Sequence, residues 1–472
     1  MDITNVLFLF WILPISLAVY YLAGERVRPY VLVAINLLFY ACGAFSYFWL
    51  FVISTLDTVG LGRSIAAVKG RVGKKALLFF GVTYNLCLLA FYKYAGTFLS
   101  RLGIAPDLAV SLRGIALPLG ISFFTFKAIS YLVDIYYQRA ELATRPVQDV
   151  LYLSFFAQVI SGPLTRYSEM SQSALSDSHK ANWDLFSEGV YRFIIGFNKK
   201  MLLANVLTNI VNETFTADFS DFSVAYAWLG AICYSLQLFF DFSGYSDMAI
   251  GLSQMFGYRC GENFRYPYTT DSVARFWRKW HISLGAWFRD YVYIPLGGSR
   301  VSGRVYLNLL AVWLLTGVWH GASLNFIAWG LGYFILIAFE RRTGLPGCLK
   351  SWVGKTVYRI LVLLFINFQW VLFRSQGLKH GLRYLRRMIY CAPNPFADQR
   401  ALFLLKDNLA FIVVGLILCM PVVPWIGKKL EGHKTAHAVY EAAVAVISLV
   451  LFVWAVSFVV SGMNNPFAYG NF

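Results

Sequence analysis

The sequence is poor in charged residues and in polar linkers. Only 14% of its 472 residues are charged and 58% are hydrophobic, whereas soluble domains carry roughly 25% charged residues. No long polar segment divides the chain into the domains of ~100–200 residues that a soluble protein of this length would form. The apolar content also excludes a disordered chain, and the 37 glycines show no collagen-like period. We therefore expect the protein to reside in a lipid bilayer.

Cysteine pairs and a cleavable leader are also missing. The seven cysteines form no CxxC pair and most lie within apolar runs, so neither a disulfide framework nor a zinc site is supported. His433 and His437 have the i, i+4 spacing of a metal-binding pair, but we predict no metal site. The first apolar run has no small-residue cleavage site after it, and it is expected to be retained as the first span.

Acidic residues are scarce beside basic ones: 24 against 41, a formal net charge of +17. In a soluble protein this surplus would suggest nucleic-acid binding, but in a membrane protein Lys and Arg collect in cytoplasmic loops that face anionic lipid. We predict no nucleic-acid partner. The same rule assigns the basic residues of segments 26–28, 63–75 and 374–387 to the cytoplasm. An even number of crossings then separates the first two segments, so the uncharged run 29–56 should form two short spans hinged near Gly43.

Apolar runs follow one another along the rest of the chain. A membrane helix needs ~20 apolar residues, and residues 305–339 carry no charge, which is enough for two spans joined by a tight turn near 321–323. Runs 150–163 and 242–258 are too short or too polar to span simply, and such backbone is tolerated at membrane depth only beside protein or a water-filled cavity. The prediction is an all-α polytopic membrane protein with ten to thirteen crossings, in which short or re-entrant helices surround a central tunnel. Residues 1–472 form one membrane domain in this interpretation.

One histidine lies deep within an uncharged run, in the motif Gly317-Val318-Trp319-His320-Gly321. An ionisable side chain at that depth is costly and is a candidate functional residue by default. Imidazole is also well suited to accept and return a proton near neutral pH. The alternative is a core histidine hydrogen-bonded to a neighbouring helix. Gly317 and Gly321 favour a functional role because they would let another backbone or a thin substrate approach.

Cations and large aromatic residues alternate in a second segment, residues 275–291. At helical spacing it contains Arg275, Trp277, Arg278, Lys279, Trp280 and His281. One interpretation is an interfacial helix, with Trp in the headgroup region and cations toward phosphates. The other is a cytoplasmic entrance that attracts an anionic donor, such as a coenzyme or a phosphopantetheine-bearing protein. Both can hold at once.

Two carboxylates, Asp241 and Asp247, lie beside apolar runs. Acid–base chemistry is one possible role, although a gap of six residues does not place both on one helical face. A structural role, such as capping a broken helix or pairing with an Arg of the basic segment, explains them equally well. Ser243 and Ser246 between them lack the GxSxG context of a hydrolase nucleophile.

Several motifs, taken together and in order, resemble the membrane-bound O-acyltransferase family, and within it the bacterial branch that acetylates alginate. They are 241–251 (DFSGYSDMAIG), 276–284 (FWRKWHISL), 287–291 (WFRDY) with 295–298 (PLGG), and 317–321 (GVWHG). Further likenesses are 118–123 (PLGISF), 161–163 (SGP) and Asn465-Pro466-Phe467. The resemblance covers most of the chain.

The resemblance implies a helical bundle with a central tunnel, in which His320 is catalytic and His281 is the second signature residue. It implies that an acyl group, preferably acetyl, comes from a cytoplasmic thioester, either acetyl-CoA or an acyl carrier, with no tightly bound cofactor. The group would pass to a separate extracytoplasmic acyltransferase or accessory protein that modifies a cell-surface polysaccharide, at the cytoplasmic membrane of a bacterium. The expected donor-binding or tunnel residues are Arg275, Trp277, Arg278, Lys279, Trp280, Trp319 and Asp247.

Two alternatives stay open on the sequence. One is D-alanyl transfer from a carrier protein to teichoic acid. The other belongs to a different class: a proton-coupled transporter or flippase that uses His281 and His320 as a proton relay. The lack of a detectable inverted repeat weighs mildly against a transporter.

Overall fold

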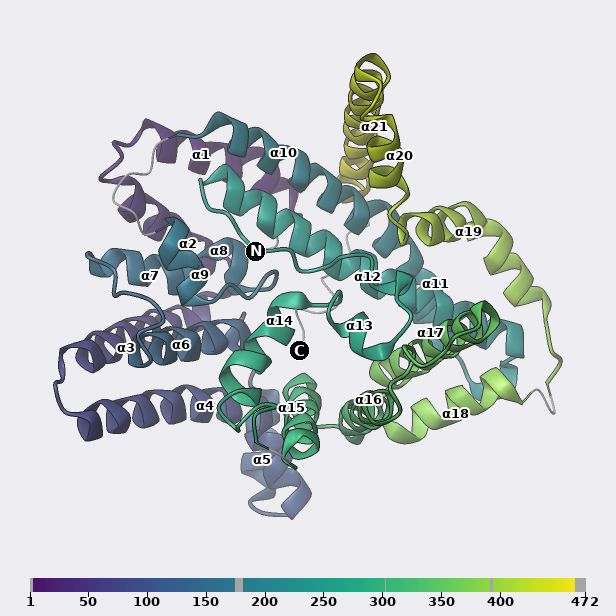
Figure 1. Cartoon of the computed structure of the whole chain (residues 1–472), viewed down its shortest axis with the longest axis horizontal. Coiled ribbons are helices and arrows are strands. Elements are labelled where there is room, and N and C mark those ends of the chain that lie inside the picture. The colour runs from purple at the N-terminus through teal and green to yellow at the C-terminus, as the bar shows by residue number, and fades with distance from the viewer. Residues whose placement is uncertain (1–2, 175–180, 302, 391–393, 463–472) are drawn as a thin grey trace. The chain divides into compact units, whose positions relative to one another are not determined.

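The computed structural model describes residues 3–174, 181–301, 303–390 and 394–462, and every regular element in these ranges is a helix (Figure 1). Seven helical segments of this part of the chain are long and apolar enough to cross a membrane, and Phe8–Leu22 and Val305–His320 are shorter apolar helices. The prediction of an all-α polytopic membrane protein is therefore confirmed. The number of crossings stays a prediction. The motif Asn465-Pro466-Phe467 lies outside the described residues.

The described residues form two compact units. Unit 1 contains residues up to 194 together with 245–262, and unit 2 contains residues 195–244 and those from 263 onward. Helices α10 (Trp183–Asn198) and α12 (Val224–Met255) each have residues in both units. The expectation of one domain over 1–472 stays a prediction, and each unit is described by itself below.

In unit 1, helices α2 (Arg28–Ala44) and α3 (Phe48–Ala67) form the pair that contains the predicted hinge. Helix α2 leaves the helical region at Ala44 (φ −156°, ψ 62°), and α3 begins at Phe48 after one short turn. The ring of Tyr40 in α2 stacks on that of Phe51 in α3, with 4.1 Å between the ring centroids. The break predicted near Gly43 is thus confirmed. Besides parts of α10 and α12, the elements of unit 1 are η1 (Phe8–Ile12), α1 (Leu13–Leu22), α2 (Arg28–Ala44), η2 (Phe45–Tyr47), α3 (Phe48–Ala67), α4 (Arg71–Leu102), α5 (Pro106–Gly114), α6 (Ile121–Tyr136), α7 (Pro146–Ser154), α8 (Phe156–Val159) and α9 (Tyr167–Ala174).

Unit 2 contains the aromatic and basic motifs. Its remaining elements are η3 (Lys199–Ala204), α11 (Asn205–Thr216), η4 (Phe219–Asp221), η5 (Pro267–Thr269), α13 (Val273–Trp277), α14 (Ile282–Phe288), η6 (Arg289–Tyr293), α15 (Val305–His320), α16 (Leu324–Thr343), α17 (Trp352–Arg374), α18 (Leu378–Ile389), α19 (Gln399–Leu418), α20 (Val422–Leu430) and α21 (Lys434–Val460). As predicted, the uncharged run 305–339 makes two helices, α15 and α16, joined by a turn at 321–323. These two helices pack closely against each other (Figure 1).

Glycine makes this close packing possible. A Cβ added to Gly317 would lie 2.6 Å from the carbonyl oxygen of Phe326, and one on Gly330 would lie 2.5 Å from that of Trp313. Both distances are shorter than a carbon atom tolerates, so the approach of α15 to α16 depends on glycine at both positions. The neighbour predicted to approach Gly317 is thus the backbone of α16.

The polar run 242–258 is not a separate membrane segment. Residues 242–255 are the C-terminal part of α12, a continuous helix of 32 residues, and residues 256–258 follow its end. Its polar character follows from its surroundings, because Asp241, Ser246 and Asp247 are all buried within the protein. The other short run, 150–163, forms the short helices α7 and α8, in agreement with the expectation of short elements.

Candidate active site

Glu340, near the C-terminal end of α16, fixes the start of α13. Its carboxylate accepts hydrogen bonds from the backbone N–H groups of Val273 (2.6 Å) and Ala274 (2.9 Å). The Ser272 hydroxyl accepts the N–H of Arg275 and caps the same helix. A carboxylate at a helix N-terminus satisfies the unpaired N–H groups of the first turn and complements the helix dipole. The helix that begins the basic-aromatic segment is therefore held against α16.

Cations and aromatic residues of this segment point in different directions. Arg275 and Arg278 are exposed and Lys279 is half-buried, whereas Phe276 and Trp280 are buried completely or nearly so. The alternation seen in the sequence therefore separates into an outer charged side and an inner aromatic side. The segment is not one interfacial helix, because α13 ends at Trp277 and α14 begins only at Ile282.

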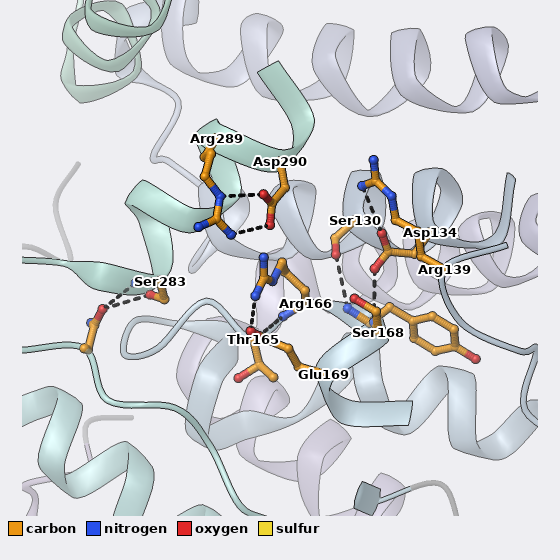
Figure 2. A network of polar contacts seen from close by, with 12 residues as sticks. Ser130, Asp134, Arg139, Thr165, Arg166, Ser168, Glu169, Ser283, Arg289 and Asp290 are labelled. Carbon is orange, nitrogen blue, oxygen red and sulfur yellow. Dashed lines mark hydrogen bonds and ion pairs between the residues drawn. The ribbon is translucent and has the colours of Figure 1, made fainter. Parts of the chain in front are cut away.

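His281 lies at this break. Its backbone has φ +44° and ψ +54°, the left-handed region that residues other than glycine rarely adopt. Asn263 holds the neighbouring residues: its Oδ1 accepts hydrogen bonds from the N–H (3.3 Å) and the hydroxyl (2.8 Å) of Ser283 and lies 3.1 Å from Nδ1 of His281. The bonds at Ser283 are drawn in Figure 2. Backbone strain of this kind tends to cluster at functional sites.

The hydrogen bond to Asn263 defines the tautomer of His281. A carbonyl oxygen can only accept, so Nδ1 of His281 must carry the proton and Nε2 keeps its lone pair. Burial lowers the pKa of His281 to about 3, because the charged imidazolium loses its hydration there. His281 is therefore a neutral ring with a fixed orientation near pH 7.

His320 is the last residue of α15 and is 3% exposed. Its ring lies 4.6 Å from Trp319, 5.0 Å from Trp329 and 4.9 Å from Phe373, measured between centroids. The three aromatic rings surround an ionisable group with apolar material. An imidazole ring in its neutral form can accept a proton.

One aromatic cluster joins the two histidines. It comprises Phe242, Phe264, Phe276, Trp277, Trp280, Trp313, Trp329, Tyr333, Trp370 and Phe373, whose rings make successive contacts. At one end His281 packs against Phe242 at 4.6 Å, and at the other His320 packs against Phe373 at 4.9 Å. The structure thus brings Trp277, Trp280, Trp319 and both histidines into one region of unit 2.

Three buried hydrogen-bond donors of this cluster have no acceptor. They are Nε1 of Trp277, Nε1 of Trp329 and the hydroxyl of Tyr333, none of which reaches a partner in the described part of the chain. By contrast, Nε1 of Trp370 donates to the Tyr268 hydroxyl at 3.1 Å. Buried Trp and Tyr side chains normally find a partner, and each that does not calls for an explanation. A substrate with acceptor groups that passes through the cluster would supply one.

The two carboxylates of α12 have structural partners. Asp247 belongs to unit 1, where it accepts a hydrogen bond from Nε of Arg192 (2.8 Å), which also pairs with Glu262. Asp241 belongs to unit 2 and pairs with Lys200. Both partners come from the region of α10 and η3, and neither belongs to the basic segment 275–291. The role of Asp247 in donor binding stays a prediction.

Figure 2 also shows polar pairs within each unit. In unit 2, Arg289 and Asp290 of η6 form a two-point ion pair at 2.7 and 3.1 Å. In unit 1, Asp134 pairs with Arg139 at 3.6 Å and accepts the N–H of Ser168 at 3.0 Å. The contacts of Asp134 join α6 to the start of α9 and to Arg139 in the connection that follows α6.

Sequence reasoning missed four residues that build the site: Asn263, Trp329, Glu340 and Trp370. Nothing in the local sequence marks Asn263, since its importance comes from a contact 18 residues away. Glu340 could be noticed in the sequence as the acidic residue that ends the uncharged run 305–339, but nothing there indicated its contact with α13. The two tryptophans are ordinary members of apolar helices until their neighbours are known.

Comparison with known proteins agrees with this geometry. The model of the membrane-bound O-acyltransferase family matches residues 146–373, which include both histidines and the aromatic cluster. A protein of Pseudomonas syringae pv. tomato named "Probable alginate O-acetylase AlgI" is 37% identical over 450 residues, which cover 91% of this chain and 84% of that protein. The peptidoglycan O-acetyltransferase of Helicobacter pylori is 33% identical over 420 residues, covering 81% of this chain and 79% of that protein.

A further relative transfers a different group. The teichoic acid D-alanyltransferase of Bacillus subtilis is 29% identical over 284 residues, which cover 56% of this chain and 70% of that protein. Similarity is therefore higher and more extensive to the O-acetylating relatives than to this D-alanylating one.

Proposed function

Because the chain belongs to the membrane-bound O-acyltransferase family, it is an O-acyltransferase, and we propose that it takes an acetyl group from a cytoplasmic thioester for the O-acetylation of an exported polysaccharide. The observation that carries this proposal is the aromatic cluster that joins Trp277, between the exposed Arg275 and Arg278, to His320. The relatives that share four fifths or more of the chain's length are named for acetylation. The family's chemistry is group transfer, so the proton-coupled transporter is set aside, and D-alanyl transfer is the second candidate.

The charges at the two ends of unit 2 support an orientation in the membrane. A crossing helix has its ends on opposite sides, so the cations at the start of α17 cannot share a side with segment 374–387. One end of unit 2, called the α13 end here, contains α13, the start of α15, the end of α16 and the start of α17. It is the more basic end, with Arg275, Arg278, Lys279, Arg300, Arg304, Arg341, Arg342, Lys350, Lys355 and Arg359. The α18 end has Arg374, Lys379, Arg383, Arg386 and Arg387. The positive-inside rule then favours a cytoplasmic α13 end and an extracytoplasmic α18 end, which revises the expectation for 374–387.

The donor enters at the α13 end in this proposal. Arg278 and Lys279 attract the phosphates of coenzyme A or of a carrier-bound phosphopantetheine arm, and Arg275 contributes less because it already pairs with Asp271 at 2.6 Å. The unpaired donors of Trp277, Trp329 and Tyr333 bind carbonyl oxygens of the arm as it passes. The thioester then reaches His320.

His320 acts as the general base. Its imidazole removes the proton from an acceptor hydroxyl, whose oxygen attacks the thioester carbonyl and forms a C–O bond. The C–S bond breaks, and the leaving thiolate takes the proton back from the imidazolium. The hydroxyl belongs to an extracytoplasmic acyltransferase or accessory protein that completes the modification of the polymer. Positioned base catalysis contributes ~10²–10⁴ in rate.

His281 positions the donor in this scheme. Its neutral ring and fixed tautomer present Nε2 as an acceptor, which suits an amide N–H of the arm better than the reacting hydroxyl. His281 lies at the break between α13 and α14, where its backbone has a positive φ, and its ring packs against Phe242 of the aromatic cluster. It therefore connects the proposed entrance with the cluster.

The test is transfer of radiolabelled acetate from acetyl-CoA to polysaccharide in bacterial membranes. His320→Ala should lower transfer by ~10² or more at equal protein level, and His433→Ala, at an exposed histidine, should leave it unchanged. Undiminished transfer in His320→Ala contradicts the assignment. Efficient transfer of D-alanine from a carrier thioester, without transfer of acetate, would favour the second candidate.

A further inference from the structure

Unit 2 contains a cavity of about 640 Å³ that shares no lining residue with the aromatic cluster. It lies between helix α18 and the chain segment 215–219, which ends α11 and leads into η4. Gln376, just before α18, also contributes to its wall. The described chain thus has a concave site at the end of unit 2 where α17 is followed by α18.

The lining of this cavity is strongly basic. Helix α18 supplies His380, Arg383, Arg386 and Arg387, and among the side chains that the structure describes Asp218 contributes the one carboxylate of the lining. That carboxylate already accepts hydrogen bonds from the N–H (2.8 Å) and the hydroxyl (2.9 Å) of Ser220.

Two of these cations lack a carboxylate partner. Within the described residues, neither Arg383 nor Arg386 forms an ion pair, and both are exposed. Several like charges facing one concave site raise the local potential and favour an anionic ligand. Arginine also binds carboxylates and phosphates through two parallel hydrogen bonds.

Other groups in the cavity suit a sugar. His380 Nδ1 has no hydrogen-bond partner in the described residues, and burial lowers the pKa of His380, so that a neutral ring is available to a hydroxyl. Gln376 adds an amide that both donates and accepts. The Phe219 ring, 5.1 Å from that of His380, offers an apolar surface to the C–H face of a pyranose.

Helix α18 has one exposed apolar face and one basic face, and the basic face lines the cavity. Leu382 and Ile389 are exposed and lie seven residues apart on one face, whereas His380, Arg383 and Arg387 share another. An interfacial helix places its exposed apolar face in the hydrocarbon and its basic face toward water. The basic face lines the cavity, which favours a ligand from the aqueous phase over a lipid headgroup.

The cavity lies at the same end of unit 2 as His320. Asn325, the second residue of α16, donates from its side-chain amide to the carbonyl oxygens of Leu372 (3.0 Å) and Ser375 (3.2 Å), at the junction of α17 and α18. The residues that follow His320 are thereby tied to the segment that leads into the cavity wall.

We propose that this cavity binds the carboxylate groups of an acidic polysaccharide on the extracytoplasmic side of the membrane. The arginines of α18 hold the carboxylates, and His380 and Gln376 bind neighbouring hydroxyls. The inference rests on the proposed function for the side of the membrane and for the presence of a glycan. It adds the substrate class: the polymer is a polyanion, and the transferase itself retains it near the site of acyl transfer.

The test measures binding of hexagalacturonate to the full-length protein in nanodiscs of phosphatidylcholine. The double variant Arg383→Gln/Arg386→Gln should weaken binding at least tenfold, and Arg383→Lys/Arg386→Lys should retain most of it. The matched control Lys428→Gln/Lys429→Gln, which removes the same charge from exposed positions on α20, should leave affinity unchanged. Fully methyl-esterified hexagalacturonate should bind at least tenfold more weakly, and binding should decline as salt rises.

Each contrary outcome overturns the proposal. The cavity does not bind carboxylates if Arg383→Gln/Arg386→Gln, at unchanged thermal stability, binds hexagalacturonate as tightly as the unaltered protein does. The same follows if the unaltered protein binds the neutral methyl ester as tightly as the acid. Binding of phosphatidylglycerol that depends on Arg383 and Arg386, without binding of hexagalacturonate, assigns the cavity to a lipid headgroup. His320→Ala should bind hexagalacturonate normally, so failure of acetyl transfer and failure of glycan binding are observed separately.

Discussion

Unit 1 and the aromatic cluster of unit 2 differ in the kind of buried polar group that stands out in each. In unit 1 the buried carboxylates have cationic partners: Asp149 with Arg63 at 2.7 Å, and Asp134 with Arg139 at 3.6 Å. In unit 2 the aromatic cluster buries three donors, on Trp277, Trp329 and Tyr333, for which the described chain offers no acceptor.

This difference separates stabilising contacts from a candidate binding site. A charge taken out of water must be paired, or the fold loses several kcal/mol. A neutral N–H or O–H that is left unpaired costs ~1–3 kcal/mol, which a stable fold can tolerate where a ligand will supply the acceptor. The paired carboxylates of unit 1 therefore indicate structural contacts, and the unpaired aromatic donors near His320 mark a candidate substrate path in unit 2.

The largest effect on stability is expected from Arg63→Met. It leaves the Asp149 carboxylate, which is fully buried, with the Tyr167 hydroxyl but without a cation, and should lower the free energy of unfolding by about 3 kcal/mol. Denaturation of the purified protein in detergent measures this change. Arg289→Met, which breaks the exposed Arg289–Asp290 pair of unit 2, should cost less than about 1 kcal/mol.

A double variant sharpens this prediction. Arg63→Met/Asp149→Asn removes the buried charge and keeps a partner for Tyr167, so it should be more stable than Arg63→Met alone. If the double variant is the less stable of the two, burial of an unpaired charge is not the cause of the loss.

The next effect is expected on catalysis from Trp329→Phe. This change removes an unpaired indole N–H and keeps an aromatic ring, so stability should change little while KM for the acyl donor rises by about 2–10-fold. The matched control is Trp370→Phe, which removes an N–H that is already bonded to Tyr268. It should lower stability by about 1 kcal/mol and leave KM nearly unchanged. Equal kinetic effects of the two changes would remove the distinction between paired and unpaired donors.

The smallest effect is expected from pH at His281. Burial lowers the pKa of its folded state to about 3, against 6.5 when exposed, so between these values the unfolded chain binds more protons than the folded one. Stability contributed by the neutral ring is thus present above pH 6.5 and declines as the pH falls, by at most about 1.4 kcal/mol per pH unit.

Thermal unfolding at pH 7 and pH 5.5 measures this decline. His281→Asn should remove its share of the decline, because asparagine does not titrate and tolerates a positive φ. An unchanged difference between the two pH values in that variant would assign the decline to other groups.

The helical class was predicted from the sequence and is confirmed, and the two histidines stay candidates whose surroundings only the structure describes. His320 was recognisable because an ionisable residue within an uncharged run is costly in a membrane. The hinge near Gly43 and the turn at 321–323 followed from charge placement and run length. The structure of residues 242–258 was harder to predict, because the polar residues of α12 are explained only by partners such as Arg192 and Lys200.

In the basic-aromatic segment, too, the sequence did not predict the local backbone structure. Its composition predicted an interface or an entrance, and both interpretations stay predictions. The structure adds that Arg275 and Arg278 are exposed and that Phe276 and Trp280 are buried. The break after Trp277 and the left-handed backbone of His281 were not predictable, since Asn263 and Glu340 impose them from elsewhere in the chain.

The sequence by itself determined that this protein is a helical membrane protein, which histidines are candidates for its chemistry, and which family it resembles. These follow from hydrophobicity, charge and motif order, which are properties of neighbouring residues. The tertiary structure alone decided which polar groups are paired. Ring contacts, orphaned donors and the basic cavity of α18 depend on residues far apart in the chain, and hydrogen bonds act only over a few ångströms. Their pattern distinguishes the supporting framework from the proposed sites of donor and polymer.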